Sequence, residues 1–307
     1  MSDVSEISIE NRPLAGILAA HAEWALNPGR GRRCQLNGVT LNEVELRKVN
    51  LTRASLQSTT LLDADLSQAD LRGAVVTSAD FGGALLSGTD FTAASLSHVG
   101  FVSSFLSGAH FTEAKIESAK FRQAKLESAQ FQDALVKSTD FAGALLVRAL
   151  FQDAKLIECD LTKARLDGAQ MHRVHFLTCQ MPGIRATGAN FLLCRFSGCN
   201  LFRADLSGAL VQRADFQGCR LMFADLGGSD LREASFGGSD LSGAVLRNTR
   251  MGGAKLLFAN LCGADLKGAR ELTQQQLQQA LTDSTTTLPN GDHGPYIKYS
   301  GAEKPAG

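Results

Sequence analysis

The sequence predicts an all-β solenoid, a quadrilateral parallel β-helix of about twelve coils with a short helical cap at each end. Three observations lead to this prediction. An apolar residue stands at every fifth position from Leu36 to Leu266, 47 times without an insertion or deletion. A small residue precedes it by two positions in 41 of those 47 units, and phenylalanines recur at steps of twenty.

The five-residue period favours short extended segments. A large residue and the small residue two positions before it lie on the same face of a strand, because successive side chains alternate sides. Both therefore point into a core. The same spacing would distribute apolar residues all around an α-helix, which excludes an α-solenoid. The remaining positions hold polar residues and glycine, which suit turns, so the chain is predicted to turn after each segment and to stack its windings about 4.8 Å apart.

Phenylalanine spacing predicts how many sides each winding has. Twenty residues per winding and five per side give four sides. Two rows in the first half are offset by ten, so they are expected to face each other across the interior. The rows are Phe81, Phe101, Phe121 and Phe141; Phe91, Phe111, Phe131 and Phe151; and later Phe176, Phe196, Phe216 and Phe236.

The units themselves resemble a known family. Residues 64–68 read Ala-Asp-Leu-Ser-Gln and residues 204–208 read Ala-Asp-Leu-Ser-Gly, and units of this kind are similar to those of pentapeptide-repeat proteins over residues 34 to about 268. The resemblance implies a right-handed quadrilateral β-helix. It also implies one candidate function, since some members resemble the DNA duplex and protect or inhibit DNA gyrase.

Four segments are expected along the chain. Residues 1–33 form an N-terminal segment with a capping helix, residues 34–270 the pentapeptide-repeat β-helix, residues 271–283 a C-terminal capping helix, and residues 284–307 an irregular or disordered tail. The repeat departs from its pattern only at residues 181–186, where the large and small positions exchange volumes. A local distortion is expected there without a break in the coil.

Charge and hydropathy exclude several classes of protein. The 31 basic and 31 acidic residues cancel, so direct nucleic-acid binding is not expected. No run approaches the 18 apolar residues of a membrane span, and the first 30 residues lack the pattern of a secretory signal. The expected location is the cytoplasm.

No catalytic motif stands out. Six cysteines occupy the small inward position, and four of them, Cys159, Cys179, Cys199 and Cys219, recur at twenty. Parallel side chains about 4.8 Å apart do not converge on a metal, so these cysteines are interpreted as small buried apolar residues. We therefore expect no enzymatic activity, no catalytic residues, no metal and no cofactor.

Apolar residues at outward positions are the best candidates for function. Contiguous exposed apolar surface usually marks a partner site, although local burial is an equal alternative. The leading hypothesis is a structural or interaction protein that binds an unidentified protein partner, with a homodimer as one option. The alternative is a DNA-mimicking modulator of DNA gyrase, but basic residues interrupt the acidic surface that such mimicry needs. They include Lys115, Lys120, Arg122, Lys125, Arg185, Arg195, Arg203, Arg213 and Arg220. The candidate patch consists of Leu192, Leu193, Phe202, Met222, Phe223, Leu257 and Phe258.

Overall fold

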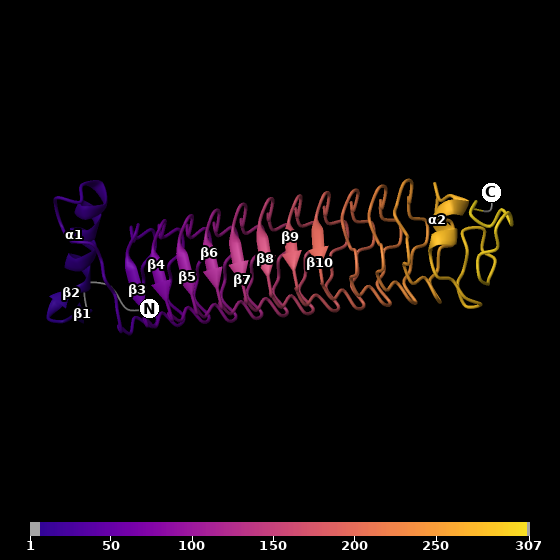
Figure 1. The fold of residues 1–307 in the computed structure, drawn as a ribbon. Helices are drawn as coiled ribbons and strands as arrows, with labels where there is room; N and C mark the ends of the chain where they lie inside the picture. The colour runs from indigo at the N-terminus through magenta and orange to yellow at the C-terminus, as the bar shows by residue number, and fades with distance from the viewer. Residues whose placement is uncertain (1–6, 306–307) are drawn as a thin grey trace. The chain divides into compact units, whose positions relative to one another are not determined.

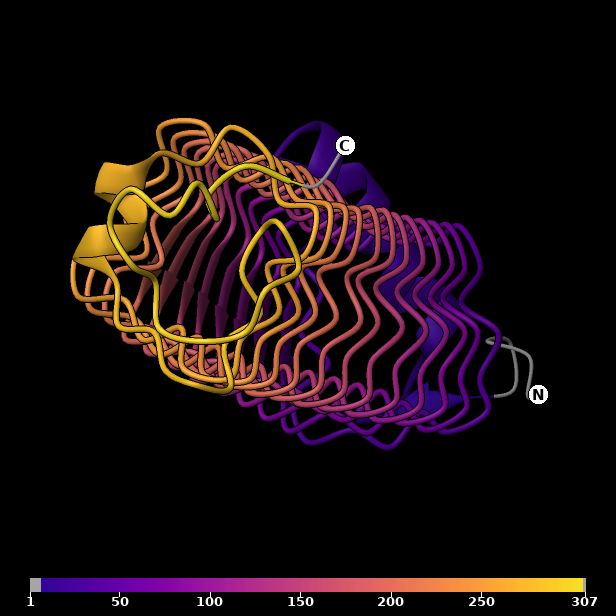
Figure 2. The same cartoon turned by 90° about the vertical axis from the view of Figure 1, so that its right-hand side faces the viewer.

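The computed structural model describes residues 7–305 as a parallel β-solenoid with short helices. It divides into two compact units, Met1–Leu150 and Phe151–Gly307, and each is described by itself. Figure 1 shows the stacked windings within each unit, and Figure 2 shows the same windings from a direction closer to their axis.

The N-terminal unit begins with a cap. Strands β1 (Ser8–Ile9) and β2 (Arg12–Pro13) form an antiparallel hairpin, and helix α1 (Leu14–Leu26) follows directly. Pro13 stands at the N-cap, where its missing N–H costs no helical hydrogen bond.

Helix α1 is anchored to the first winding by one buried polar contact. Leu14, Ile17 and His21 are its buried residues. The backbone N–H of Cys34 donates to Nδ1 of His21 over 3.0 Å, and the His21 ring stacks on Trp24. Burial lowers the pKa of His21, so the neutral ring that can accept this bond is favoured.

One side of each winding in this unit is a short parallel strand. Neighbouring strands pair with a register shift of twenty, as Leu56 opposite Val76 illustrates. The other three sides are joined by single bridges with the same shift, such as Thr40 to Thr60. The twenty-residue winding expected from the sequence is therefore confirmed. The strands are β3 (Ser55–Gln57), β4 (Val75–Thr77), β5 (Ser95–Ser97), β6 (Lys115–Glu117) and β7 (Leu135–Lys137).

The corners between sides are tight turns. The backbone N–H of Ala74 donates to the carbonyl of Leu71 over 3.0 Å, and the residue between them at the third position, Gly73, has a φ of +63°. A turn of this type requires a positive φ at that position. Before many corners an Asp or Asn side chain accepts the next free backbone N–H, as Asp70 does from Arg72. This explains the polar composition of the outward positions.

Stacked phenylalanine rings fill the core of the N-terminal unit. Ring centroids lie 5.2 Å apart in the pair Phe81 and Phe101, and 4.7 Å apart in the pair Phe101 and Phe121. Rings ten residues apart meet edge to face across the interior, as Phe91 and Phe101 do at 5.8 Å. The two rows therefore face each other as the sequence predicts, and the arrangement satisfies both favoured geometries of aromatic pairs.

Small polar residues enter this core without leaving an unsatisfied group. The Thr89 hydroxyl donates to the carbonyl of Leu66 on the preceding winding over 2.7 Å. The Ser104 hydroxyl donates to Phe101 within its own turn over 2.8 Å. Serine and threonine can replace alanine at the small position because each finds a backbone acceptor.

The C-terminal unit continues the same construction. Strands β8 (Lys155–Ile157), β9 (His175–Leu177) and β10 (Arg195–Ser197) pair in parallel with a shift of twenty. Beyond β10 the corresponding side makes single bridges, such as Arg195 to Asp215. The rings of Phe176, Phe196, Phe216 and Phe236 stack at centroid distances of 4.7, 4.3 and 5.3 Å.

Residues 181–186 pass through the coil without a break. Gly183 donates to the carbonyl of Phe202 over 2.9 Å and Ala186 to that of Asp205 over 2.7 Å, so the ladder is kept. The turn bond from Ile184 to Met181 is 3.4 Å, the same length as the bond from Thr249 to Leu246 in a regular turn, so these bonds do not show the expected local distortion. The exchange of a large and a small side chain keeps the volume of the core roughly constant.

Helix α2 (Gln274–Gln279) lies against the last windings (Figure 2). Thr273 and Gln276 form a capping box at its N-terminus. The Gln276 side chain also donates to the carbonyls of Met251 and Ala254, each over 2.9 Å, which covers two acceptors of the coil.

Helix α2 is shorter than the helix over residues 271–283 that the sequence predicts. The helix ends at Gln279 and Ala280 is extended, so Leu281 leaves the helix and pairs with Asn260 instead. Leu277 is buried, whereas Leu281 is 56% exposed.

Residues 284–305 contain no helix or strand, but their first part packs on the coil. Thr287 donates to the carbonyl of Ala264 and accepts from Leu266, both bonds close to 2.9 Å. Thr286 and Leu288 are buried. This segment therefore occupies the position that a further winding would take.

Replacing Phe121 by alanine is expected to cost about 3–5 kcal/mol of unfolding free energy, because it empties the middle of a ring column. The exposed neighbour Gln123 is the control, and Gln123→Ala is expected to stay within about 0.5 kcal/mol. Urea unfolding of both variants measures the difference. Equal losses would contradict the ring column as the main source of core stability.

Asp283 gives a pH-dependent prediction. Hydrogen bonds from Thr285 and the Gly263 N–H hold the pKa of its carboxyl at about 2, below the ordinary 3.8. The stabilisation is therefore present above pH 3.8 and is lost as the pH falls through about 2.

Asp283→Asn is accordingly expected to lower the unfolding midpoint near neutral pH and to match the wild type near pH 2. Thermal unfolding from pH 2 to 7 measures the gap, with Asp292→Asn as a control. A gap that is constant with pH would show that the carboxylate charge contributes nothing.

Candidate protein-binding surface

Three outward apolar residues of the candidate patch meet at one corner of the C-terminal unit. Phe202 and Met222 hold equivalent positions on successive windings, since Arg203 donates to the Met222 carbonyl over 3.0 Å. The rings of Phe202 and Phe223 meet edge to face at 6.0 Å. The guanidinium of Arg203 lies 5.1 Å from the Phe202 centroid and 6.0 Å from that of Phe223. We call these four residues the aromatic corner.

Glycine on the next winding makes room for the Phe223 ring. A β-carbon at Gly243 would lie 2.5 Å from the Phe223 ring, and Gly243 also has a φ of +68°. The ring therefore lies directly on the backbone of that winding. Phe223 nevertheless remains 55% exposed. A large ring that is fixed in place and still faces solvent is a feature of partner-binding surfaces.

Leu192 and Leu193 do not join this corner. They precede Phe202 and Arg203 by ten residues, which is half of a twenty-residue winding, so they lie on the opposite side. Leu193 borders a groove of about 490 Å³ between Arg173, Arg195 and Arg213. Leu192 borders a smaller groove of about 330 Å³.

Leu257 and Phe258 lie at a third corner. They follow Met222 and Phe223 by 35 residues, that is one winding and three quarters. The Phe258 N–H donates to the carbonyl of Gln279, which places this pair beside the C-terminal cap. Both side chains are exposed, with 70% for Phe258. The seven residues of the candidate patch are thus divided among three separate corners.

Sequence reasoning did not assign two residues to this site: Arg203 of the aromatic corner, and Gly243 on which the Phe223 ring rests. Arg203 precedes Phe223 by one winding and Gly243 follows it by one winding. Spacing by twenty from Phe223 would have found both, because positions twenty apart stack on each other. Sequence reasoning grouped the outward apolar residues of the C-terminal third and applied the step of twenty there only to Phe202 and Met222.

Outward apolar residues in the N-terminal unit form a weaker candidate. Leu85 and Phe105 pair across windings, and Lys125 follows them in the same column. The Lys125 ammonium lies 4.2 Å from the Phe105 ring centroid and covers it. A charged side chain therefore already occupies the face that a partner would need.

The cysteine column is a set of buried thiols. Cys219 donates to the Phe196 carbonyl over 2.8 Å, and Cys194 to that of Met171 over 2.7 Å. These are the same acceptors, one winding back, that threonine uses at this position. Burial raises the pKa of Cys219 to about 11 and raises that of Cys194 further. The Cys219 and Cys194 thiols therefore stay protonated near neutral pH and are poor nucleophiles.

No group of three or more His, Cys, Asp or Glu side chains in the described range 7–305 is arranged to hold a metal ion. The structure thus places the column of cysteines where small apolar residues otherwise stand. The cysteine side chains do not converge on one point at which a metal ion could bind.

Charge on the outward positions is mixed in both units. In the N-terminal unit, Lys115, Lys120 and Lys125 are exposed, and Arg122 pairs with Asp140. In the C-terminal unit, exposed arginines follow every few corners, namely Arg185, Arg195, Arg203, Arg213 and Arg220. A DNA-like surface needs extended negative charge. The DNA-mimicking hypothesis is therefore not favoured.

Comparison with protein-family models is decisive for the family. A model described as a pentapeptide repeat region matches residues 74–151 and 169–246, which is half of the chain. The chain belongs to the pentapeptide-repeat family. A second model of this pentapeptide-repeat family, described as eight copies of the repeat, matches residues 34–73, 137–173 and 229–268.

Solved pentapeptide-repeat proteins are similar to this chain. HetL, involved in heterocyst differentiation regulation in the cyanobacterium Nostoc sp. strain PCC 7120, is 24% identical over 89% of this chain and 96% of its own, with a TM-score of 0.28. A trypsin-treated form of QnrB1, a plasmid-mediated fluoroquinolone resistance protein, is 22% identical over 60% and 91%, with a TM-score of 0.36. A protein of the Arabidopsis thaliana thylakoid lumen is 20% identical over 51% and 81%, with a TM-score of 0.16.

Two searches add no function. No curated protein matches this chain. Within residues 7–305, neither helix combines the length and the apolar composition that crossing a membrane requires.

Thiol reactivity is expected to separate Cys262 from the six buried cysteines. Cys262 is half-buried, whereas the others are buried. Ellman's reagent at pH 8 should react rapidly with one thiol in the folded protein and with all seven in guanidinium. Cys262→Ser should abolish the rapid reaction. Rapid reaction of the Cys179 and Cys199 column in that variant would contradict its assignment as core.

Proposed function

We propose that this protein is a non-enzymatic interaction protein, and that the aromatic corner of its C-terminal unit binds a protein partner. The observation that carries the proposal is the pair of half-buried Phe202 and exposed Phe223, with the Arg203 guanidinium lying near both rings. Aromatic residues and arginine are the side chains that most often dominate binding free energy at protein interfaces.

Preorganisation supports the proposal. The Phe223 ring rests on Gly243 and the Arg203 backbone is bonded to Met222, so little side-chain entropy remains to be lost on binding. Arg203 has no carboxylate within ion-pair distance among the described residues. A partner with an apolar side chain flanked by a carboxylate would fill the space between the rings and pair with this guanidinium.

Three further expectations concern self-association, cellular location and catalysis. A second copy of this chain is one possible partner, because the aromatic corner can meet itself across a two-fold axis. The cytoplasmic location is likewise a prediction from the sequence. The absence of catalytic activity belongs to the proposal and follows from the family and from the protonated thiols.

Phe202→Asp combined with Met222→Asp is expected to abolish partner binding. A carboxylate at each position removes apolar contact area and adds charge beside an aromatic face. Loss of one aromatic anchor typically weakens binding by roughly 30-fold or more. Affinity capture from the native host, compared between wild type and variant by quantitative mass spectrometry, measures the loss, and light scattering measures self-association.

The matched control is Val102→Asp, an equally apolar exposed position in the N-terminal unit. It should leave capture unchanged. Unchanged capture by the double variant, or equal loss with the control, would remove the aromatic corner from consideration. Both variants must show the circular dichroism of the wild type, because the substituted side chains point outward and are not part of the buried core.

A further inference from the structure

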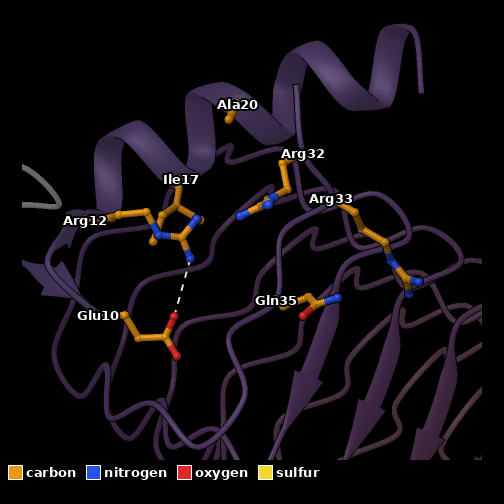
Figure 3. A pocket seen from close by; sticks show the side chains of 7 residues that line it. All are labelled: Glu10, Arg12, Ile17, Ala20, Arg32, Arg33 and Gln35. Carbon is orange, nitrogen blue, oxygen red and sulfur yellow. Dashed lines mark ion pairs between the residues drawn. The ribbon is translucent and has the colours of Figure 1, made fainter. Parts of the chain in front are cut away.

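We propose that a pocket between the N-terminal cap and the first winding binds a small phosphate-type oxyanion. The pocket has a volume of about 410 Å³ and is lined by the β1–β2 hairpin, helix α1 and the start of the coil. Figure 3 shows the guanidinium groups of Arg12 and Arg32 pointing into the same space, with Glu10 below them. Ile17 and Ala20 form the helix wall.

The backbone holds Arg32 in position. Its N–H donates to the carbonyl of Ala20 in helix α1 over 3.0 Å. The preceding residue, Gly31, has a φ of +67°, and a β-carbon there would lie 2.0 Å from the same carbonyl oxygen. Only glycine lets the chain approach the helix so closely. The direction in which Arg32 enters the pocket is therefore fixed by the fold and not by its own flexible side chain.

Positive charge exceeds negative charge in this pocket. Three arginines line it and a single carboxylate, that of Glu10, faces them. Arg12 meets Glu10 at 3.6 Å, but the two side chains are 48% and 82% exposed, so the pair is weak. Arg33 uses its Nε to donate to the Arg53 carbonyl. Across residues 7–305, the Arg32 guanidinium has no hydrogen-bond or ion-pair partner.

Guanidinium groups that converge beside a single exposed carboxylate still repel one another, and an oxyanion relieves this repulsion. Arginine matches phosphate oxygens with paired N–H donors, which makes a phosphate group the best fit to Arg12 and Arg32. The apolar wall of Ile17 and Ala20 leaves room for a small organic body attached to it. The shared chemistry is a phosphate dianion, either free or as the monoester of a small molecule.

Calorimetric titration of the full chain with inorganic phosphate and with phenyl phosphate tests the proposal. Saturable binding of either is expected, and tighter binding of phenyl phosphate would assign the monoester as the source. Arg32→Gln should weaken binding at least tenfold. Glu10→Gln should strengthen it several-fold, because this variant removes the competing carboxylate. Phenol serves as the uncharged probe and should not bind.

Arg30→Gln is the matched control. Arg30 lies two residues from Arg32 and does not line the pocket, so this variant should bind like the wild type. Absence of binding at millimolar phosphate and phenyl phosphate would overturn the proposal. Equal loss in the Arg30 and Arg32 variants would also overturn it, since non-specific charge attraction would then explain the binding. Unchanged unfolding midpoints confirm that each variant folds.

Discussion

Parallel backbone pairing between residues twenty positions apart governs the structure of both units. Each winding donates to and accepts from its neighbours with this one register, from Gln35 opposite Ser55 to Arg250 opposite Arg270. Because the shift is constant, every side chain lies above the residue twenty positions earlier. The sequence can therefore build columns of one residue type, and the core becomes rows of stacked rings, small residues and satisfied hydroxyls.

The same register controls the outward surface. A residue at a corner has neighbours twenty positions before and after it, while residues ten positions away lie on the opposite side. Exposed side chains on neighbouring windings therefore contact one another along columns of residues twenty positions apart, and not along one continuous stretch of the chain. The aromatic corner follows this rule, since Arg203, Phe223 and Gly243 are separated by steps of twenty. The rule also separates Leu192 from Phe202, although the two residues are only ten positions apart in the sequence.

Helical caps contribute features that the repeat cannot. Each cap uses one buried polar side chain to satisfy the end of the coil: His21 accepts from Cys34 at one end, and Gln276 donates to Met251 and Ala254 at the other. Such bonds fix the cap against the first or last winding of its unit. At the N-terminal cap, residues of the β1–β2 hairpin, helix α1 and the start of the coil meet in one pocket.

By itself, the sequence determined the periodic part of this protein: the β-helix, the four sides, the inward Leu and Phe positions, the capping box at Thr273 and the buried role of the cysteines. Periodicity suffices there because each inward position repeats the same environment. Tertiary structure alone decided which outward residues meet, where helix α2 ends and that residues 286–288 pack on the coil. Those outcomes depend on contacts between side chains and backbone of different windings, and local pattern does not encode them.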